Sequence, residues 1–580
     1  MGKEIEKLEN QSSNSKYIFV VGGVISGVGK GVAASSMGLL MQSRGHKVTS
    51  IKIDPYINID AGTMNPTEHG EVFVLDDGDE CDQDMGNYER FLGVDLSRTN
   101  YMTTGRVYQE VIRKERNLEY KGKNVEVVPD VPFEIIRRIK EATKVTDSDI
   151  TIIEIGGTVG EYQNVLFLEA ARMLKSKHPA DVAFVLVSYL PVPSNLGEMK
   201  TKPTQYASRT LNSAGVQADI IIARGVQALD QKRKEKIALF CNVPEENVIS
   251  APDVKSIYDI PLNFEKDKMG ETLERVLSLP KRTADLAKWK NFVSKTKNGK
   301  EKIKIAVVGK YFDSGDFVLS DVYISILEAL KFSSYESGVG IEIACVNSKD
   351  FESKKIPVSM LKKYDGILVP GGFGESGIEG IILAINYART HNIPYFGLCY
   401  GMQLMVIEYA RNVLGLKDAN TREINPDSQN LVIDVMEDQK EKIANKKMGG
   451  SMRLGAYPAV LKKGTVAEKA YFGSPKSKTK EAFGSPKSKT KATKTSQIVE
   501  RHRHRYEVNN AYREALEHAG LVFSGVSPDG TLCEIAELPT SSHPFFLGTQ
   551  FHPEFKARPL SPHPLFTAFI KACVKLASSK

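Results

Sequence analysis

The stretch Tyr17-Ile-Phe-Val-Val-Gly-Gly-Val-Ile-Ser-Gly-Val-Gly-Lys-Gly31 decides the fold class. Its β-branched and aromatic start predicts a buried strand, its glycines predict a loop, and a helical pattern follows over 31–45. Glycines at a helix N-terminus can hold phosphates with backbone N–H groups, and Lys30 can reach the outer phosphates. The stretch is not a strict Walker A motif, since Val24 and Gly31 replace its first glycine and its Ser or Thr. A glycine-rich helix entry with an incidental lysine is the alternative.

Strand and helix patterns alternate along the rest of the chain, which indicates parallel, doubly wound sheets. Apolar strand runs lie at 47–53, 150–155, 182–187, 219–223, 303–308, 341–346 and 366–369, with a helical pattern at 321–331. A Lys-rich polar stretch interrupts the pattern at 281–302. We therefore expect an α/β protein of two doubly wound domains. The predicted parts are a disordered tail at 1–15, a P-loop-like domain at 16–280, a linker at 281–302 and a second domain at 303–576.

Composition argues against several classes of protein. A unit at 472–480 recurs at 483–491, inside a Lys- and Ser-rich stretch that predicts a low-complexity insertion over 472–497. Between Tyr471 and Gln497 there are seven lysines and one glutamate, so this segment holds nearly all of the formal charge of +7. The remainder is close to neutral, unlike the basic face of a nucleic-acid binder. Six cysteines without a CxxC pair favour a reducing, cytoplasmic setting. No apolar run approaches the ~20 residues of a membrane helix.

A cysteine, a histidine and a glutamate form the second constellation. Cys399 stands between an apolar strand pattern and a helical run, where a tight turn strains the backbone and a helix N-terminus favours thiolate. His552 and Glu554 are two residues apart and would face the same side of a strand. With the glycine turn at 369–374, which follows a strand, they suggest nucleophile, base, orienter and oxyanion hole. A buried structural cysteine and a simple glycine turn are the alternatives.

Two carboxylates are candidates for a metal site. Asp84 lies in a polar stretch, and Glu154 ends an apolar strand just before a Gly-Gly pair. The carboxyl end of a parallel strand is where magnesium nucleotides bind in such sheets. Taken alone, each residue is more often a solvated acid or a cap.

From Ile303 onward, these elements resemble the class I glutamine amidotransferases. The phosphate loop, Lys52-Ile-Asp-Pro-Tyr-Ile-Asn-Ile-Asp60, Gly156-Gly-Thr-Val-Gly160 and Lys200-Thr-Lys-Pro-Thr-Gln205 resemble the CTP synthases. The resemblance covers about residues 16–575 and implies a ligase that aminates UTP to CTP with ATP, the last step of de novo pyrimidine nucleotide synthesis. In such enzymes ammonia from glutamine is channelled to a second site and reacts with 4-phospho-UTP.

The resemblance also implies the residues of each site. Cys399 would be the nucleophile, His552 the base and Glu554 its orienter. Glutamine would be bound by Gly372, Tyr400, Gly401, Met402, Gln403, Glu423 and Arg505, the last in a basic run that composition alone would assign to a solvated strand. ATP would be bound by Gly27, Val28, Gly29, Lys30, Gly31, Val32, Lys52, Asp84, Asp253 and Val254. UTP and CTP would be bound by Ser26, Glu161, Tyr162, Gln163, Lys200, Thr201, Lys202, Pro203, Thr204, Gln205 and Lys236. Magnesium would be bound by Asp84 and Glu154, and the ammonia inlet would be lined by Pro66, His69 and Val72.

Cofactors and partners follow from the same resemblance. They are Mg²⁺ with ATP, GTP as an allosteric activator, CTP as a competitor of UTP, and other copies of the chain in a homotetramer or in filaments. No nucleic-acid or membrane partner is expected, and the location is cytoplasmic.

This sequence departs from the family pattern at three places. Glu161-Tyr162-Gln163 stands where the family usually has Asp-Ile-Glu, which questions UTP affinity and CTP feedback. Asp130 replaces a usual His, and Ser376 replaces a usual Arg in a region tied to GTP activation.

Two other functions remain open at this stage. The first is another ATP-dependent glutamine amidoligase, which would amidate a carboxylic acid in place of UTP. The second is an inactive filament subunit, whose expected mark, loss of Cys399, Lys30 or Asp84, is absent from the sequence.

Overall fold

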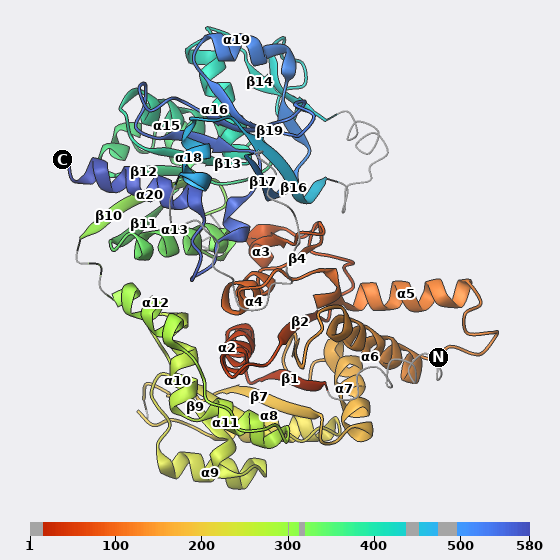
Figure 1. Ribbon diagram of the computed structural model, residues 1–580. Coiled ribbons are helices and arrows are strands. Elements are labelled where there is room, and N and C mark those ends of the chain that lie inside the picture. The colour runs from red at the N-terminus through yellow and green to blue at the C-terminus, as the bar shows by residue number, and fades with distance from the viewer. Residues whose placement is uncertain are drawn as a thin grey trace. The chain divides into compact units, whose positions relative to one another are not determined.

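The computed structural model describes residues 15–195, 197–297, 299, 301–312, 320–436, 452–473 and 496–580. Apart from Ser15 and the edge residues of the insertion, the predicted tail and the predicted insertion lie outside these residues. The chain forms two compact units (Figure 1). Unit 1 contains the chain up to Asp60 and Asn87–Val293, and unit 2 contains Ala61–Gly86 and Ser294–Lys580.

Unit 1 is built on a seven-stranded sheet in which every pair of neighbours is parallel. Both faces of the sheet are covered, so all residues of its inner strands β2 and β6 are buried. In spatial order the strands are β5 (Tyr101–Thr103), β2 (Val48–Asp54), β6 (Ile150–Ile155), β1 (Lys16–Gly23), β7 (Val182–Tyr189), β8 (Ile220–Gly225) and β9 (Val248–Pro252).

Helices pack on both faces of this sheet. Phe19 and Ile153 join one apolar cluster with the helices α6 to α9, whereas Gly38 of α2 lets that helix approach Ile152 on the other face. The helices are α2 (Lys30–Ser43), α5 (Thr104–Arg116), α6 (Val127–Val145), α7 (Val165–Lys177), α8 (Lys202–Ser213), α9 (Gln231–Cys241), α10 (Ile260–Lys266) and α11 (Met269–Val276), while α4 (Asp84–Leu92) crosses the boundary between the units. The 3-10 turns are η1 (Arg98–Asn100), η2 (Tyr162–Asn164), η3 (Glu245–Asn247) and η4 (Ile257–Asp259).

The range predicted as a linker, 281–302, is not all loop. It contains helix α12 (Ala287–Lys297), whose Trp289, Phe292 and Val293 are buried. The Trp289 indole donates a hydrogen bond to the Tyr258 carbonyl at 2.9 Å. Apolar residues three and four apart form one face of a helix, so this Lys-rich segment packs its apolar face on unit 1 and turns its lysines to solvent.

Unit 2 is built on a nine-stranded mixed sheet. Its first five strands are mutually parallel, and the others are antiparallel to their neighbours. In spatial order they are β11 (Gly340–Asn347), β10 (Lys302–Gly309), β12 (Gly366–Val369), β13 (Tyr395–Leu398), β21 (Phe546–Thr549), β20 (Cys533–Glu537), β19 (Val522–Val526), β16 (Arg453–Leu461) and β17 (Gln497–His504). The prediction of two α/β domains is confirmed.

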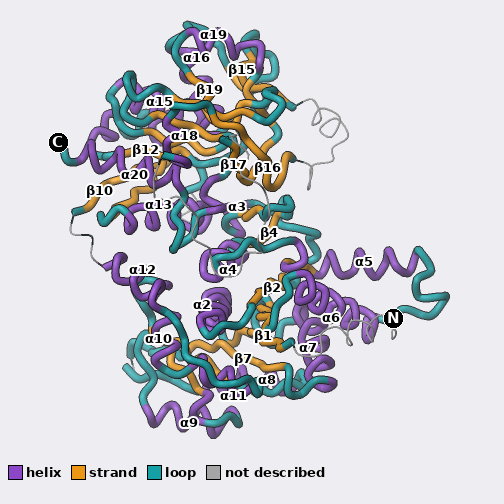
Figure 2. The backbone as a smooth tube through the Cα atoms, viewed as in Figure 1, coloured by secondary structure: helices purple, strands orange, loops and turns teal. Residues whose placement is uncertain are grey.

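The remaining elements of unit 2 are helices, short strands and turns (Figure 2). The helices are α3 (Pro66–His69), α13 (Ile324–Glu336), α14 (Ser348–Glu352), α15 (Ile378–Thr390), α16 (Tyr400–Asn412), α18 (Val466–Phe472), α19 (Arg513–His518) and α20 (Pro564–Ala577). The short strands are β3 (Val72–Val74), β4 (Glu80–Asp82), β14 (Asn420–Thr421), β15 (Leu431–Val435) and β18 (Tyr506–Val508). The 3-10 turns are η5 (Ser320–Tyr323), η6 (Val358–Lys363), η7 (Asn510–Tyr512) and η8 (Pro553–Lys556). Among the residues described, none of the helices combines the length and apolar character of a membrane span.

The β3–β4 hairpin belongs by sequence to the N-terminal half but packs in unit 2, against β16 and β17. Asp76 pairs with the fully buried Arg501 at 2.5 Å, and Glu80 pairs with Arg503 at 2.8 Å. A Cβ atom at Gly455 would lie 2.6 Å from the backbone nitrogen of Gly78, so the two backbones touch. Two ion pairs and a backbone contact therefore fix the hairpin on the sheet of unit 2.

Candidate active sites

Cys399 occupies a sharp turn between strand β13 and helix α16. Its backbone has φ 49° and ψ −97°, a strained conformation for a residue with a side chain. Close packing maintains the turn, because a Cβ atom at Gly401 would lie 2.4 Å from the Val369 carbonyl oxygen. The Cys399 amide donates to the Thr549 carbonyl at 2.6 Å. The turn presents the thiol at the N-terminus of α16, as the sequence predicts.

His552 and Glu554 meet in a different local structure from the predicted strand. They lie at the start of the 3-10 turn η8, directly after strand β21. His552 Nδ1 is 2.7 Å from Glu554 Oε1, and both side chains are buried. The Phe555 ring stacks on the imidazole with centroids 5.0 Å apart, and a Cβ atom at Gly371 would lie 2.8 Å from His552 Cε1. The imidazole is therefore held by a carboxylate, a ring and a glycine that leaves it room.

The charge state of His552 depends on its neighbours. Burial alone would lower its pKa, but the Glu554 carboxylate and the thiolate form of Cys399 outweigh burial and raise the pKa of His552 to about 10. Cys399 raises this pKa more through its charge than through its hydrogen bond with the imidazole. A protonated His552 can therefore stabilise a thiolate at Cys399.

A loop after strand β12, residues 371–374, borders the Cys399 turn. The amide of Gly374 donates to Glu423 at 2.8 Å, and its carbonyl accepts from Lys310 and from the Tyr400 hydroxyl at 3.1 Å. No acceptor for the Gly372 amide occurs among the residues described, which leaves this N–H available to an oxyanion. Burial lowers the pKa of Lys310 to about 8 although Glu423 opposes the shift. Burial likewise raises the pKa of Glu423.

The other residues predicted to bind glutamine lie around the same turn. Tyr400, Gly401, Met402 and Gln403 form the first turn of α16 and are buried. Arg505 is also buried, and burial lowers its pKa. Its run does not form a solvated strand, since Arg501 and His502 in β17 are fully buried.

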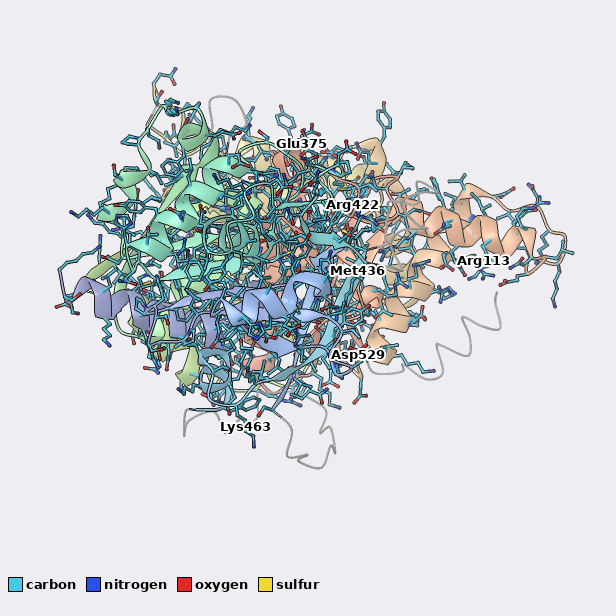
Figure 3. All side chains as sticks on the ribbon, turned by 90° about the horizontal axis from the view of Figure 1, so that it is seen from above. Arg113, Glu375, Arg422, Met436, Lys463 and Asp529 are labelled. Atoms are coloured by element: carbon cyan, nitrogen blue, oxygen red, sulfur yellow. The ribbon has the colours of Figure 1, made fainter. Side chains whose placement is uncertain are left out.

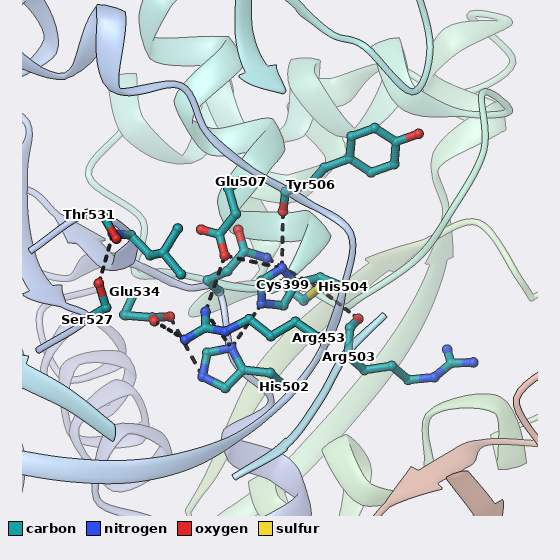
Figure 4. Close-up of polar contacts among 12 residues, drawn as sticks. Cys399, Arg453, His502, Arg503, His504, Tyr506, Glu507, Ser527, Thr531 and Glu534 are labelled. Carbon is teal, nitrogen blue, oxygen red and sulfur yellow. Dashed lines mark hydrogen bonds and ion pairs between the residues drawn. The ribbon is translucent and has the colours of Figure 1, made fainter. Parts of the chain in front are cut away.

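A buried polar cluster lies behind Cys399 (Figure 4). Arg453 pairs with Glu534 at 2.8 Å and with Glu507 at 3.3 Å. Beside it, His502 Nδ1 is 2.9 Å from His504 Nε2. Burial, and after it the charge of Arg453, lowers the pKa of both histidines well below the ordinary value. Both imidazoles are therefore neutral, and Arg453 holds the positive charge of this cluster.

The glycine-rich loop of unit 1 runs from strand β1 into helix α2. Gly27 and Gly29 have φ of 68° and 91°, values that favour glycine. Lys30 donates to the Gly157 carbonyl at 2.9 Å, across the mouth of the sheet. Arg224, which the sequence analysis missed, donates to the Val28 carbonyl at 3.0 Å and pairs with Asp253 at 2.9 Å. The sequence could have indicated Arg224, because it directly follows an apolar strand run and so lies at the carboxyl edge of the sheet.

Carboxylates and a lysine gather at the carboxyl ends of β2 and β6. Lys52 Nζ is 2.9 Å from Glu154 Oε1 and 3.8 Å from Asp54 Oδ1, and Tyr88 donates to the other oxygen of Glu154. Two carboxylates and one ammonium leave a net negative charge, and oxygen donors suit Mg²⁺. Asp84 is the first residue of helix α4. No cluster of three metal-ligating side chains occurs in the described parts of the chain.

The residues predicted to bind the pyrimidine nucleotide differ in exposure, since Thr201 and Thr204 are buried whereas Lys236 is exposed. Thr201 to Gln205 start helix α8, Lys200 pairs with Glu198 at 3.0 Å, and Lys236 is exposed on α9. Tyr162, in η2, is 97% exposed. Two of the residues that depart from the family pattern are Asp130 and Ser376. Asp130 accepts from the Glu126 backbone N–H at 2.9 Å near the start of α6, and Ser376 is exposed.

Comparison with known proteins decides the family. Residues 16–279 match the family model of the CTP synthase N-terminus, and residues 318–572 match class-I glutamine amidotransferases. CTP synthase from Thermococcus gammatolerans is 48% identical over 560 residues, covering 96% of this chain and 98% of that protein. The chain belongs to the CTP synthase family. Another CTP synthase, from Pyrococcus furiosus, is 48% identical and covers 98% of this chain and 99% of that protein.

Membership in the CTP synthase family makes the protein a glutamine-hydrolysing ligase that produces CTP with ATP, and it confirms the resemblance drawn from the sequence. Among solved structures, the glutaminase domain of the Trypanosoma brucei enzyme with bound acivicin is 37% identical, with a TM-score of 0.39, and covers 47% of this chain and 94% of that chain.

Proposed function

We propose that unit 2 releases ammonia from glutamine and that unit 1 uses it to aminate a phosphorylated UTP. The observation that carries the proposal is the buried Cys399 turn beside the His552–Glu554 pair. His552 takes the thiol proton, Cys399 Sγ attacks the amide carbon of glutamine, and the Gly372 amide binds the resulting oxyanion. The C–N bond then breaks, ammonia leaves with a proton from His552, and water hydrolyses the γ-glutamyl thioester.

In unit 1, ATP transfers its γ-phosphate to O4 of UTP, which gives ADP and 4-phospho-UTP. Ammonia adds to C4, and phosphate leaves with the former O4 to give CTP. Lys30 and the backbone amides of the glycine loop neutralise the ATP phosphates, and Lys52 stabilises charge beside Glu154. Glu154 and Asp84 would hold Mg²⁺, which supplies further neutralisation of the phosphates when it is bound.

Delivery of ammonia has to keep the nitrogen unprotonated, since ammonium is no nucleophile. The residues proposed to line the inlet are Pro66, His69 and Val72. They lie in α3 and β3, which pack in the same compact unit as Cys399 although they belong to the N-terminal half of the sequence. This placement supports channelling of ammonia inside the protein.

Oligomer formation has support from exposed apolar side chains. Leu239 and Phe240 are 77% and 52% exposed on α9, next to Lys236. Ile112 and Leu118 are exposed on and just after helix α5, which extends outward from the sheet of unit 1 where Figure 3 labels Arg113. Exposed apolar surface of this kind favours contact with further copies of the chain, as in the homotetramer or filaments of the proposal. GTP activation and a cytoplasmic location complete the proposal by family resemblance.

A single substitution tests the division of labour. Cys399→Ala should abolish CTP formation from glutamine, since no nucleophile remains, and should preserve CTP formation from added ammonium chloride. The matched control is Cys345→Ala, a half-buried cysteine in β11, which should retain both activities. Equal loss of both activities in Cys399→Ala, measured as CTP produced from UTP and ATP, would contradict the proposal.

A further inference from the structure

Gln550, which the sequence analysis did not assign, contacts the reactive sulfur directly. It follows strand β21, and its backbone N–H donates to the Glu534 carbonyl at 2.8 Å. The side chain is fully buried, and its Nε2 atom lies 3.6 Å from Cys399 Sγ, a hydrogen-bond distance for sulfur. A buried amide against the nucleophile is a candidate for a role in the chemistry.

The orientation of this amide follows from its other contacts. Gln550 Oε1 accepts from Gln403 Nε2 at 3.3 Å, and the same nitrogen donates to the Tyr506 carbonyl at 2.9 Å. A carbonyl can only accept, so the Gln403 group that faces Tyr506 is its NH₂. The same NH₂ then requires an acceptor from Gln550. The oxygen of Gln550 thus faces Gln403, and its N–H group faces the sulfur.

The two protonation states of Cys399 use different partners. As a thiol, Sγ–H can donate to the Arg503 carbonyl, 3.8 Å away. As a thiolate, the sulfur can no longer donate, and it can accept the Gln550 N–H. A hydrogen bond to the charged form favours that form, so the Gln550 contact gains strength when the proton leaves.

The charged groups around the sulfur leave a role for a neutral donor. His552 and Glu554 supply one imidazolium–carboxylate pair. His502 and His504, packed beside the turn, are neutral, and the charge of Arg453 is engaged by Glu534 and Glu507. The one positive charge that acts on the sulfur from this set is therefore that of His552. A neutral donor such as the Gln550 N–H adds to the effect of that charge while the sulfur is a thiolate, before it bonds to the amide carbon.

We infer that Gln550 is a further catalytic residue of the glutaminase centre, whose side-chain N–H stabilises and orients the Cys399 thiolate for attack on glutamine. The inference rests on the proposed role of Cys399 as nucleophile. In the step concerned, the proton passes from Sγ to His552 Nε2 and a lone pair of sulfur forms the bond to the amide carbon. The donor N–H of Gln550 is not transferred.

The test is the pH dependence of Cys399 alkylation in the full-length protein. Gln550→Met keeps the length and removes the donor, so thiolate forms less readily. The pH midpoint of iodoacetamide alkylation, followed on the Cys399 peptide by mass spectrometry, should rise by about one unit. Gln550→Glu, which places an acceptor against the sulfur, should raise it further. For Gln550→Met, kcat/KM for glutamine should fall about 10-fold, and CTP formation from ammonium chloride should persist.

Controls separate this role from a structural one. Asn386→Leu removes a partly buried amide that donates to Glu408 at 2.8 Å in the same unit, and should leave the alkylation midpoint in place. An unchanged midpoint in both Gln550 variants would overturn the inference, as would equal loss of the ammonia-driven reaction. If Cys399→Ala keeps its use of glutamine, the proposed function itself fails. If that variant is inactive with glutamine but Gln550→Met alkylates as the parent does, the role of Gln550 alone is wrong.

Discussion

The two candidate centres differ in how far their side chains are buried. In unit 2, Cys399, His552 and Glu554 are 4%, 7% and 3% exposed. His552 and Glu554 are already hydrogen-bonded to each other. In unit 1, Ser26 and Lys236 are exposed, and Tyr162 is 97% exposed. Burial suits the proposed thiol chemistry of unit 2, which must exclude water, whereas the candidate set of unit 1 combines exposed side chains with buried ones such as Lys30, Lys52 and Glu154. Substitutions should therefore have sharp, selective effects in unit 2 and graded effects in unit 1.

The largest expected effect is that of Glu554→Gln. Loss of the carboxylate removes the charge and alters the hydrogen bond that orient His552, so glutamine-driven synthesis should fall about 10³-fold. The ammonia-driven reaction should be preserved. The carboxylate raises the pKa of His552, so its loss lowers that pKa, and the imidazolium proposed to protonate the leaving nitrogen of glutamine is lost at lower pH. The alkaline fall in residual activity should therefore begin at lower pH, as a pH–rate profile would reveal.

The matched control is another buried carboxylate–imidazole pair of unit 2, Glu500 with His563, whose atoms are 3.0 Å apart. Glu500→Gln should leave the position of the alkaline limb unchanged. A shift of similar size in both variants would mean that the profile reports general electrostatics of the unit and not the catalytic imidazole.

An intermediate effect is expected for Lys30→Ala in unit 1. This lysine crosses the mouth of the sheet to the Gly157 carbonyl, where it can neutralise the outer phosphates. Its loss should lower CTP formation about 10²-fold whether glutamine or ammonia supplies the nitrogen. Lys47→Ala, which breaks an exposed ion pair with Asp147, is the control and should be close to the parent. If Lys30→Ala impaired only the glutamine-driven reaction, the proposed role of Lys30 in the ATP-dependent step, which both nitrogen sources share, would be wrong.

The smallest effect is expected for Tyr162→Ile, which restores the residue usual in the family. Because the side chain is almost fully exposed, the change should alter the KM for UTP by about two- to threefold, and KM for ATP should stay constant as an internal reference. A tenfold change would show that Tyr162 becomes buried in the working enzyme, against a ligand or a second copy of the chain.

Much of this architecture could be predicted from the sequence because local patterns determine it. The strands predicted at 150–155 and 366–369 have those bounds in the structure, since continuous apolar runs mark strands that are buried on both faces. The Cys399 turn was predicted for the same reason: a strand, a nucleophile and a helix follow one another directly in the chain. The helix inside the Lys-rich stretch at 281–302 was harder to predict, because it has only one narrow apolar face among many lysines.

What the sequence could not reveal depends on contacts between distant segments. His552 and Glu554 meet across a 3-10 turn and not along a strand, and no local pattern separates the two. Gln550 gains its role from its neighbours Gln403 and Cys399, about 150 residues earlier in the chain, through the pairing of β13 with β21. Lys310 likewise owes its lowered pKa to burial in the folded unit, where it donates to the Gly374 carbonyl of a distant loop.

The β3–β4 hairpin has a consequence for how this enzyme can be recombined. Arg501 and Arg503 find their counter-ions in Asp76 and Glu80, more than 400 positions earlier in the chain. A chimera joined to a relative at the boundary between the two halves would set one parent's carboxylates against the other parent's arginines, with the Arg501 side chain wholly enclosed. The part of the chain that must be transferred together is therefore discontinuous in sequence. A transplanted glutaminase domain keeps these two ion pairs only if the N-terminal segment that carries Asp76 and Glu80 is transplanted with it.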